Sequence, residues 1–257
     1  MPGNKIVVND NSNTAERVIK FFGEFFGTAV LVFLGCQGCV KLTAIGQPHE
    51  SIAWIFGLAV MVAIQCFGHV SGGHINPIVT LAAAILGHLP LLLVPIYFLA
   101  QFLGALAGYA TLMAMTPPGI LKGPEAAVGT CSPAFGPGIT APQALLNEFV
   151  LSFILTLTCC AVWDWRNTDK HDSVTLRLGF MITVLAMAGG PYSGANMNPA
   201  RSFAPALLNG DWAGHWVYWV GPLSAGAAAA ILYRFAFTKS QPEKTRTPEG
   251  IPLNEKA

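Results

Sequence analysis

The chain has 257 residues, of which 53% are hydrophobic and 11% are charged. Soluble domains carry about 25% charged residues, so this chain lacks the polar side chains that would cover a water-exposed surface. Lipid is therefore its expected solvent. The net charge of +1 excludes the basic surface of a nucleic-acid-binding protein and the charge excess of a disordered acidic protein.

Six apolar stretches approach the length needed to cross a bilayer, about 20 residues. The sequence predicts transmembrane helices over residues 21–40, 52–68, 89–115, 145–163, 175–190 and 216–237. Two shorter apolar segments, 75–86 and 197–208, span only about 18 Å at 1.5 Å per residue. We expect them to be re-entrant half-helices, so the predicted fold class is an all-α membrane protein with six transmembrane helices and two half-helices.

Basic residues predict the orientation of the chain. An even number of spans places both termini on one side, and if that side is the cytoplasm it carries 11 of the 14 Lys and Arg residues. Only Lys41 and Lys122 then lie outside, while Arg201 lies within a half-helix. This asymmetry follows the positive-inside rule. We therefore expect a multi-pass plasma-membrane protein with cytoplasmic termini and, since no apolar core precedes residue 21, no cleaved signal peptide.

The cysteines do not predict disulfide bonds. Five of the six lie in the predicted spans and are expected to pack as small hydrophobic side chains; only Cys131 is expected in an outer loop. These five are Cys36, Cys39, Cys66, Cys159 and Cys160. No spacing to histidine matches a metal site, so neither a metal nor a cofactor is predicted.

The chain contains an internal repeat. The motif Ser71-Gly72-Gly73-His74-Ile75-Asn76-Pro77 returns 122 positions later as Ser193-Gly194-Ala195-Asn196-Met197-Asn198-Pro199. Upstream, Glu24-Phe25 corresponds to Glu148-Phe149. Each repeat contains three full spans and one half-helix, and because three is odd the second copy enters the membrane inverted. Inverted repeats with interrupted helices point to a permeation site near the bilayer midplane.

Each half-helix begins with an Asn-Pro pair. Proline suits the first helical position, and asparagine before it is a good N-cap. The inverted repeat is expected to bring Asn76 and Asn198 together at the positive ends of two helix dipoles, which repel cations. Their amides can then donate hydrogen bonds to water or to a hydroxyl. A single copy would be explained as a helix cap, but two copies within apolar sequence favour a pore.

With Ile78 after the first motif and Ala200-Arg201-Ser202 after the second, the sequence resembles the aquaporin (major intrinsic protein) family over about residues 17–237. The resemblance implies six tilted helices plus two half-helices, assembled as homotetramers with one pore in each subunit. It also implies a central constriction formed by Asn76, Pro77, Ile78, Asn198, Pro199 and Ala200. The family usually has alanine at the position of Ile78, and we expect this bulkier side chain to narrow or reshape the pore centre modestly.

The expected organisation follows from the spans and the repeat. Residues 1–17 form a cytoplasmic N-terminal tail, residues 18–238 the channel domain, and residues 239–257 a cytoplasmic C-terminal tail. Within the domain, the repeats cover about 18–115 and 141–238, joined by a linker at about 116–140.

The resemblance further implies an outer selectivity filter with four positions. They correspond to Phe56, Ala186, Ala195 and Arg201. Water-selective members have histidine at the position of Ala186, and no histidine occurs here between His171 and His215. Alanine leaves a wider and more apolar space, which suits glycerol and urea, while Arg201 can donate to their oxygens.

Other positions are typical of water channels. Ser202 stands where glycerol facilitators have aspartate, and Ala206 stands where they have a basic residue. A water-channel scaffold with a small residue in place of the histidine resembles the insect entomoglyceroporin branch. We therefore predict a passive channel for water, glycerol and urea that excludes ions and protons. A strictly water-selective channel, with its filter closed by Ile78 or a rotated Phe56, is the alternative.

Two carboxylates, Glu24 and Glu148, lie within predicted spans. Intramembrane ionisable residues are candidates for function, so a proton-coupled transporter is a rival interpretation. Their symmetric placement favours a structural role, in which each accepts hydrogen bonds from the following Asn-Pro loop. His74 is expected to line the pore near the cytoplasmic mouth, with gating by pH as the lesser alternative. No catalytic triad or phosphate-binding loop occurs, so no enzyme is expected.

Glycines four residues apart on two spans, among them Gly104 and Gly108, predict close helix packing. The spacing does not decide whether this packing lies within one subunit or between subunits.

Overall fold

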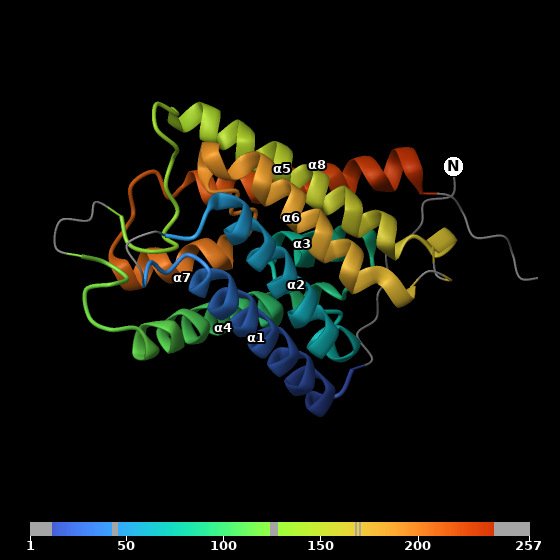
Figure 1. The fold of residues 1–257 in the computed structure, drawn as a ribbon. Helices are drawn as coiled ribbons and strands as arrows, with labels where there is room; N and C mark the ends of the chain where they lie inside the picture. Colours follow the sequence, from blue (N-terminus) through green and yellow to red (C-terminus); the bar gives the residue numbers. More distant parts are fainter. Residues whose placement is uncertain (1–11, 43–45, 124–127, 168, 170, 239–257) are drawn as a thin grey trace, which may run out of the picture.

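The computed structural model describes residues 12–42, 46–123, 128–167, 169 and 171–238 (Figure 1). The predicted C-terminal tail and most of the N-terminal tail lie outside these residues. Within the described ranges the chain is helical and contains no strand. Six helices are long and apolar enough to cross a membrane, and two shorter helices lie among them (Figure 1). The predicted fold class is therefore confirmed.

The helices follow the order expected from the repeat. The six long helices are α1 (Thr14–Gln37), α2 (His49–Ser71), α4 (Val94–Met115), α5 (Ala141–Trp163), α6 (Val174–Ser193) and α8 (Val217–Leu232). The two short helices are α3 (Pro77–Leu86) and α7 (Pro199–Asn209). A π-helical turn at Tyr233–Phe237 continues α8, and short 3-10 turns occupy Leu91–Leu93, Trp165–Asn167 and His171–Ser173.

The starts of three helices differ from the sequence prediction for local reasons. Helix α1 begins seven residues before the predicted span, because Asn13 caps it by accepting a hydrogen bond from the Glu16 amide at 2.9 Å. The short helices begin two residues later than predicted, at Pro77 and Pro199, because the backbone before each proline is not helical.

The packing of the helices repeats in the two halves of the chain. Helix α1 packs on α2 and α4, and its counterpart α5 packs on α6 and α8. The short helices exchange partners, since α3 packs on α8 and α7 packs on α4. Helices α2 and α6 join the halves by packing on each other.

The closest helix contacts depend on glycine. A Cβ atom on Gly104 or Gly108 of α4 would lie 2.2 or 2.3 Å from the carbonyl oxygens of Phe25 and Ala29 on α1. Such distances are shorter than any van der Waals contact, so only glycine permits this approach. The glycine spacing of α4 therefore serves packing within the subunit.

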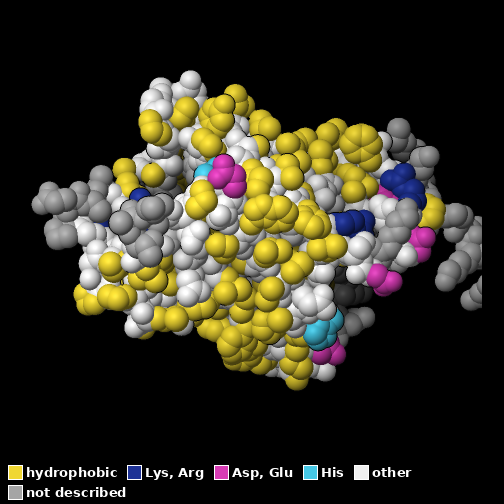
Figure 2. Space-filling view, in the orientation of Figure 1, with side chains coloured by type: hydrophobic (Ala, Val, Ile, Leu, Met, Phe, Trp, Pro, Cys, Tyr) yellow, Lys and Arg dark blue, Asp and Glu magenta, His cyan; other side chains and the backbone are white. Residues whose placement is uncertain are grey.

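The outer surface of the bundle is apolar. Large side chains that point outward include Leu99, Leu146 and Val184, which are 56%, 63% and 63% exposed. Figure 2 shows hydrophobic side chains across the middle of the visible face, with several Lys and Arg side chains toward its right-hand end. Exposed apolar area on this scale requires a non-aqueous neighbour, which agrees with the composition.

A disulfide bond joins Cys36 and Cys131, so the prediction of no disulfide is wrong. Cys36 lies in the last turn of α1, where the helix reaches the end of the bundle, and Cys131 lies in the linker between α4 and α5, which folds back over that end. The apolar sequence around Cys36 predicted a buried small side chain and gave no sign of a bonding partner. The remaining described cysteines, Cys39, Cys66, Cys159 and Cys160, are free thiols.

Candidate functional site

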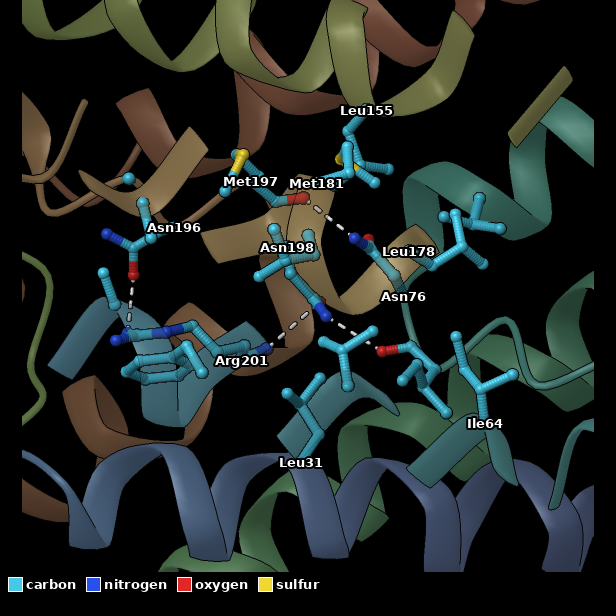
Figure 3. Close-up of a pocket in the computed structure, with 18 of the residues that line it drawn as sticks. Leu31, Ile64, Asn76, Leu155, Leu178, Met181, Asn196, Met197, Asn198 and Arg201 are labelled. Atoms are coloured by element: carbon cyan, nitrogen blue, oxygen red, sulfur yellow. Dashed lines mark hydrogen bonds between the residues drawn. The ribbon is translucent and has the colours of Figure 1, made fainter. Parts of the chain in front are cut away.

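A cavity of about 350 Å³ lies along the middle of the bundle. Its lining extends from His49 at the start of α2 to Trp163 at the end of α5, which are opposite ends of the bundle. One side is apolar and includes Leu31, Ile64, Leu155, Leu178 and Met181 (Figure 3). The other side is formed by the loops that precede α3 and α7.

The side chains of Asn76 and Asn198 meet near the middle of this cavity (Figure 3). Each caps its helix, because Asn76 Oδ1 accepts from the Ile78 amide at 3.0 Å and Asn198 Oδ1 accepts from the Ala200 amide at 3.0 Å. Each amide nitrogen also donates to the opposite loop. Asn76 Nδ2 donates to the Met197 carbonyl, and Asn198 Nδ2 donates to the Ile75 carbonyl, both at 2.9 Å.

These crossed hydrogen bonds leave donors for a solute. An amide NH₂ group carries two donors, and the cross-loop bond uses one of them. Both asparagines line the cavity. Each can therefore offer a second N–H there, at the positive end of a short helix.

The buried carboxylate of Glu24 holds the first loop in shape. Oε1 accepts from Ser71 Oγ at 2.7 Å and from the His74 amide at 2.8 Å. Oε2 accepts from the Ile75 amide at 2.7 Å and from Gln101 Nε2 at 2.8 Å. The two carboxyl oxygens thus accept four hydrogen bonds, which fill the acceptor positions of the group.

Glu148 makes the corresponding bonds in the second repeat. Its carboxylate accepts from Ser193 Oγ at 2.6 Å and from the amides of Asn196 and Met197 at 2.8 and 2.7 Å. Among the described residues, neither Glu24 nor Glu148 lines the cavity. Proton coupling through these groups would require contact with the permeation path, whereas their hydrogen bonds come from the two loops, from the ends of α2 and α6 and, for Glu24, from Gln101 of α4.

The loops need this support because their backbone is strained. Ile75, Ala195 and Met197 have φ values of 47°, 47° and 51°. This left-handed region costs an L-residue about 1–2 kcal/mol. The bonds from Glu24 and Glu148 to the amides of Ile75 and Met197 therefore stabilise a conformation that the chain would otherwise avoid.

All four residues of the expected filter line the same cavity: Phe56, Ala186, Ala195 and Arg201. The Arg201 guanidinium carbon lies 4.8 Å from the centroid of the Phe56 ring, within the range of a cation–π interaction. On its other side the ring packs against Gly35 of α1, where a Cβ would lie 2.3 Å from Phe56 Cε1. The Phe56 ring is thus held between Gly35 and Arg201.

The Arg201 guanidinium is fixed by groups that sequence reasoning did not identify. Nη1 donates to Asn196 Oδ1 at 2.6 Å, as Figure 3 shows, and to the Cys131 carbonyl at 2.9 Å. Nη2 lies 3.3 Å from Cys131 Sγ. Because Cys131 is bonded to Cys36, the disulfide connects α1 to the segment that orients the arginine. The only sequence signal was the polar Asn196 between apolar neighbours in the second motif.

The linker that carries Cys131 is anchored to the end of α7. Asp211 accepts from the Gly129 amide at 2.7 Å and forms an ion pair with Lys122. Burial would raise the pKa of the Asp211 carboxyl, but the hydrogen bonds from Lys122, Ser132 and Gly129 hold it below its usual value. The carboxylate is therefore ionised at neutral pH and keeps the linker in place.

Ile78 does not narrow the cavity, contrary to the sequence expectation. Its side chain is fully buried and packs on α8, where a Cβ on Gly226 would lie 3.1 Å from Ile78 Cβ. Among the described residues that line the cavity, neither Ile78 nor its counterpart Ala200 is present. The same holds for Pro77 and Pro199.

His74 lines the cavity toward the end where α5 finishes. Its Nδ1 lies 3.2 Å from Thr80 Oγ1, and its ring centroid is 5.1 Å from that of Tyr97 and 5.8 Å from that of Trp163. This aromatic packing fixes the orientation of the ring. A second histidine of the lining, His49, was missed because it lies beside no motif.

Comparisons with known proteins agree with this geometry. Residues 11–233 match the sequence model of the family described as Major intrinsic protein. The chain is 37% identical over 232 residues to aquaporin-4 of Mus musculus, covering 89% of this chain and 70% of that protein. It is 42% identical over 214 residues to the lens fiber major intrinsic protein of Lithobates pipiens, covering 83% and 79%. The X-ray structure of the aquaglyceroporin from Plasmodium falciparum matches with a TM-score of 0.76 and 28% identity, covering 86% of this chain and 96% of that one. The chain belongs to the major intrinsic protein family.

Proposed function

We propose that this channel passes water, glycerol and urea and excludes ions and protons. The observation that carries the proposal is the small side chain of Ala186 in a cavity that Phe56 and Arg201 also line. An imidazole at this position would fill space beside the arginine. Alanine leaves that space to the carbon atoms of a solute. The same feature supports our proposal that the chain resembles the insect entomoglyceroporin branch of the family.

The chemistry of the lining suits an uncharged polyol or amide. Glycerol and urea need hydrogen-bond partners in a dry pore, because an unpaired polar group there costs about 1–3 kcal/mol. Arg201, Asn76 and Asn198 supply donors along one side of the cavity, and apolar side chains face the carbon atoms on the other. Cations are repelled by the Arg201 charge and by the positive ends of α3 and α7.

We also propose that the protein lies in the plasma membrane with both termini in the cytoplasm and functions as a homotetramer. The Lys and Arg distribution supports the orientation. Membership of the family and the exposed apolar side chains support the assembly.

Substitution of Ala186 by histidine tests the proposal. Liposomes that contain the purified protein are mixed with sucrose, glycerol or urea in the outer solution. Stopped-flow light scattering follows their shrinkage as water leaves and their reswelling as a permeant solute enters. We expect Ala186→His to lower glycerol permeability at least about tenfold, a barrier increase of about 1.4 kcal/mol, while water still passes. Ala188→His places the same ring on the exposed side of α6 and should leave glycerol flux unchanged.

Two outcomes would overturn the proposal. Wild-type protein that passes water but neither glycerol nor urea is the strictly water-selective alternative. Flux that saturates with solute concentration and follows a pH gradient identifies a coupled transporter instead; we expect flux proportional to concentration.

A further inference from the structure

His49 enters the cavity from an element that the filter positions do not predict. It is the first residue of α2, and it lines the cavity together with Phe56, two turns further along the same helix. Its Nε2 lies 3.1 Å from the carbonyl oxygen of Met187 on α6, 138 residues away. Ala186 also lines this cavity, so the imidazole and the small filter residue lie along the same path.

Gly190 makes room for this ring. A Cβ at Gly190 would lie 2.1 Å from Cε1 and 2.8 Å from Nε2 of His49. No heavier residue at position 190 is compatible with the observed ring position, and Gly190 lies one turn beyond Ala186 on α6. The small residues Ala186 and Gly190 and the imidazole of His49 therefore form one arrangement.

The contact with Met187 also determines what the ring can offer to a solute. A carbonyl oxygen only accepts hydrogen bonds, so Nε2 carries the proton. In the neutral ring, Nδ1 is then an acceptor. This nitrogen lies beside α6 as well, since a Cβ on Gly190 would be 3.1 Å from Nδ1.

We propose that His49 is a specificity-determining residue of this channel. From α2, it places an imidazole beside Gly190, one turn beyond Ala186, and narrows the mouth of the cavity beyond Phe56. This inference rests on the proposed function as a solute channel, and it sets the upper size of the solute.

A coupling experiment tests the inference. Permeabilities to water, glycerol and the four-carbon polyol erythritol are measured in liposomes for wild type, His49→Ala, Gly190→Ala and the double variant. We expect His49→Ala to raise the erythritol-to-glycerol ratio about tenfold, because the mouth widens. Gly190→Ala should change this ratio when the ring is present, since the added methyl displaces it, and should have no effect in the His49→Ala background. His69→Ala, an exposed histidine at the other end of α2, is the matched control.

Failure of this inference and failure of the proposed function give different results. If wild type passes glycerol and His49→Ala keeps the wild-type solute profile, His49 does not determine specificity and the channel function stands. If Gly190→Ala acts equally in both backgrounds, the arrangement is likewise refuted. If wild type excludes glycerol and His49→Ala admits it, the proposed function is wrong and the role of His49 holds. Water flux in every variant shows that the protein is folded.

Discussion

At the scale of single residues, the side chains proposed to form the filter are held in place by contacts with neighbouring groups. Arg201 is oriented by Asn196 and Cys131, and the Phe56 ring packs between Arg201 and Gly35. The motifs identified Arg201 and Phe56. They did not identify the contacts with Cys131 and Gly35, because these join segments far apart in the sequence. We expect this support to keep the proposed filter in shape while solutes pass. Substitution of a supporting residue should therefore alter selectivity.

Gly35 provides the clearest test of this support. Gly35→Ala should lower glycerol permeability about tenfold, because the new Cβ would overlap the Phe56 ring and force it toward the cavity. Overpacking of this kind also costs about 1–3 kcal/mol of stability. Stopped-flow measurements on liposomes give the permeability. Gly123→Ala, whose Cβ would have its nearest contact at 3.6 Å, is the control, and unchanged glycerol flux in Gly35→Ala would show that the ring position does not limit passage.

At the scale of elements, hydropathy and the repeat predicted the helices, while long-range contacts escaped prediction. Each half-helix was visible because an Asn-Pro pair precedes a short apolar run, and the spans were visible because lipid imposes their length. The Cys36–Cys131 bond joins residues separated by 95 positions, and the His49 contact joins residues separated by 138. No local pattern marks such partners. The bundle therefore follows from the sequence alone, whereas the mouth of its cavity requires the packed structure.

The disulfide should stabilise the mouth of the cavity. Replacing both Cys36 and Cys131 by serine should lower the free energy of unfolding by about 2–4 kcal/mol, since the linker that holds Arg201 loses its tie to α1. Circular dichroism during heating in detergent measures the effect. Cys66→Ser, at an exposed free thiol, should have little influence. Peptide mapping without reductant should find Cys36 and Cys131 in one linked pair; separate, unlinked peptides would contradict the structure.

At the scale of the whole molecule, the placement of Lys and Arg residues supports the proposed orientation in the membrane. Arg17 and Lys20 lie in the first turns of α1, and Arg234 lies beyond α8. These positions share one end of an even-numbered bundle. Lys41 follows the opposite end of α1 and is exposed. The proposed orientation therefore places Lys20 on the cytoplasmic side of the membrane and Lys41 on the outer side, at the two ends of one helix.

Labelling of intact cells tests this orientation. A membrane-impermeant amine reagent should modify Lys41 in intact cells and Lys20 only after the membrane is permeabilised, with both sites followed by mass spectrometry. Exchanged behaviour of the two lysines would reverse the orientation. Modification of both lysines in sealed cells would contradict a single orientation.

The crossed hydrogen bonds of the two asparagines impose an order on the assembly of the protein during its synthesis. The Ile75 carbonyl receives its hydrogen bond from Asn198, 123 residues later in the chain. Ribosomes add about 5–20 residues per second, so Asn198 is synthesised roughly ten seconds after Ile75. Until Asn198 is made, the Ile75 carbonyl lacks this hydrogen-bond partner, so the first repeat cannot complete the crossed pair by itself. The centre of the channel is thus completed only after the second repeat has been made, and a nascent chain cannot conduct before that repeat has entered the membrane.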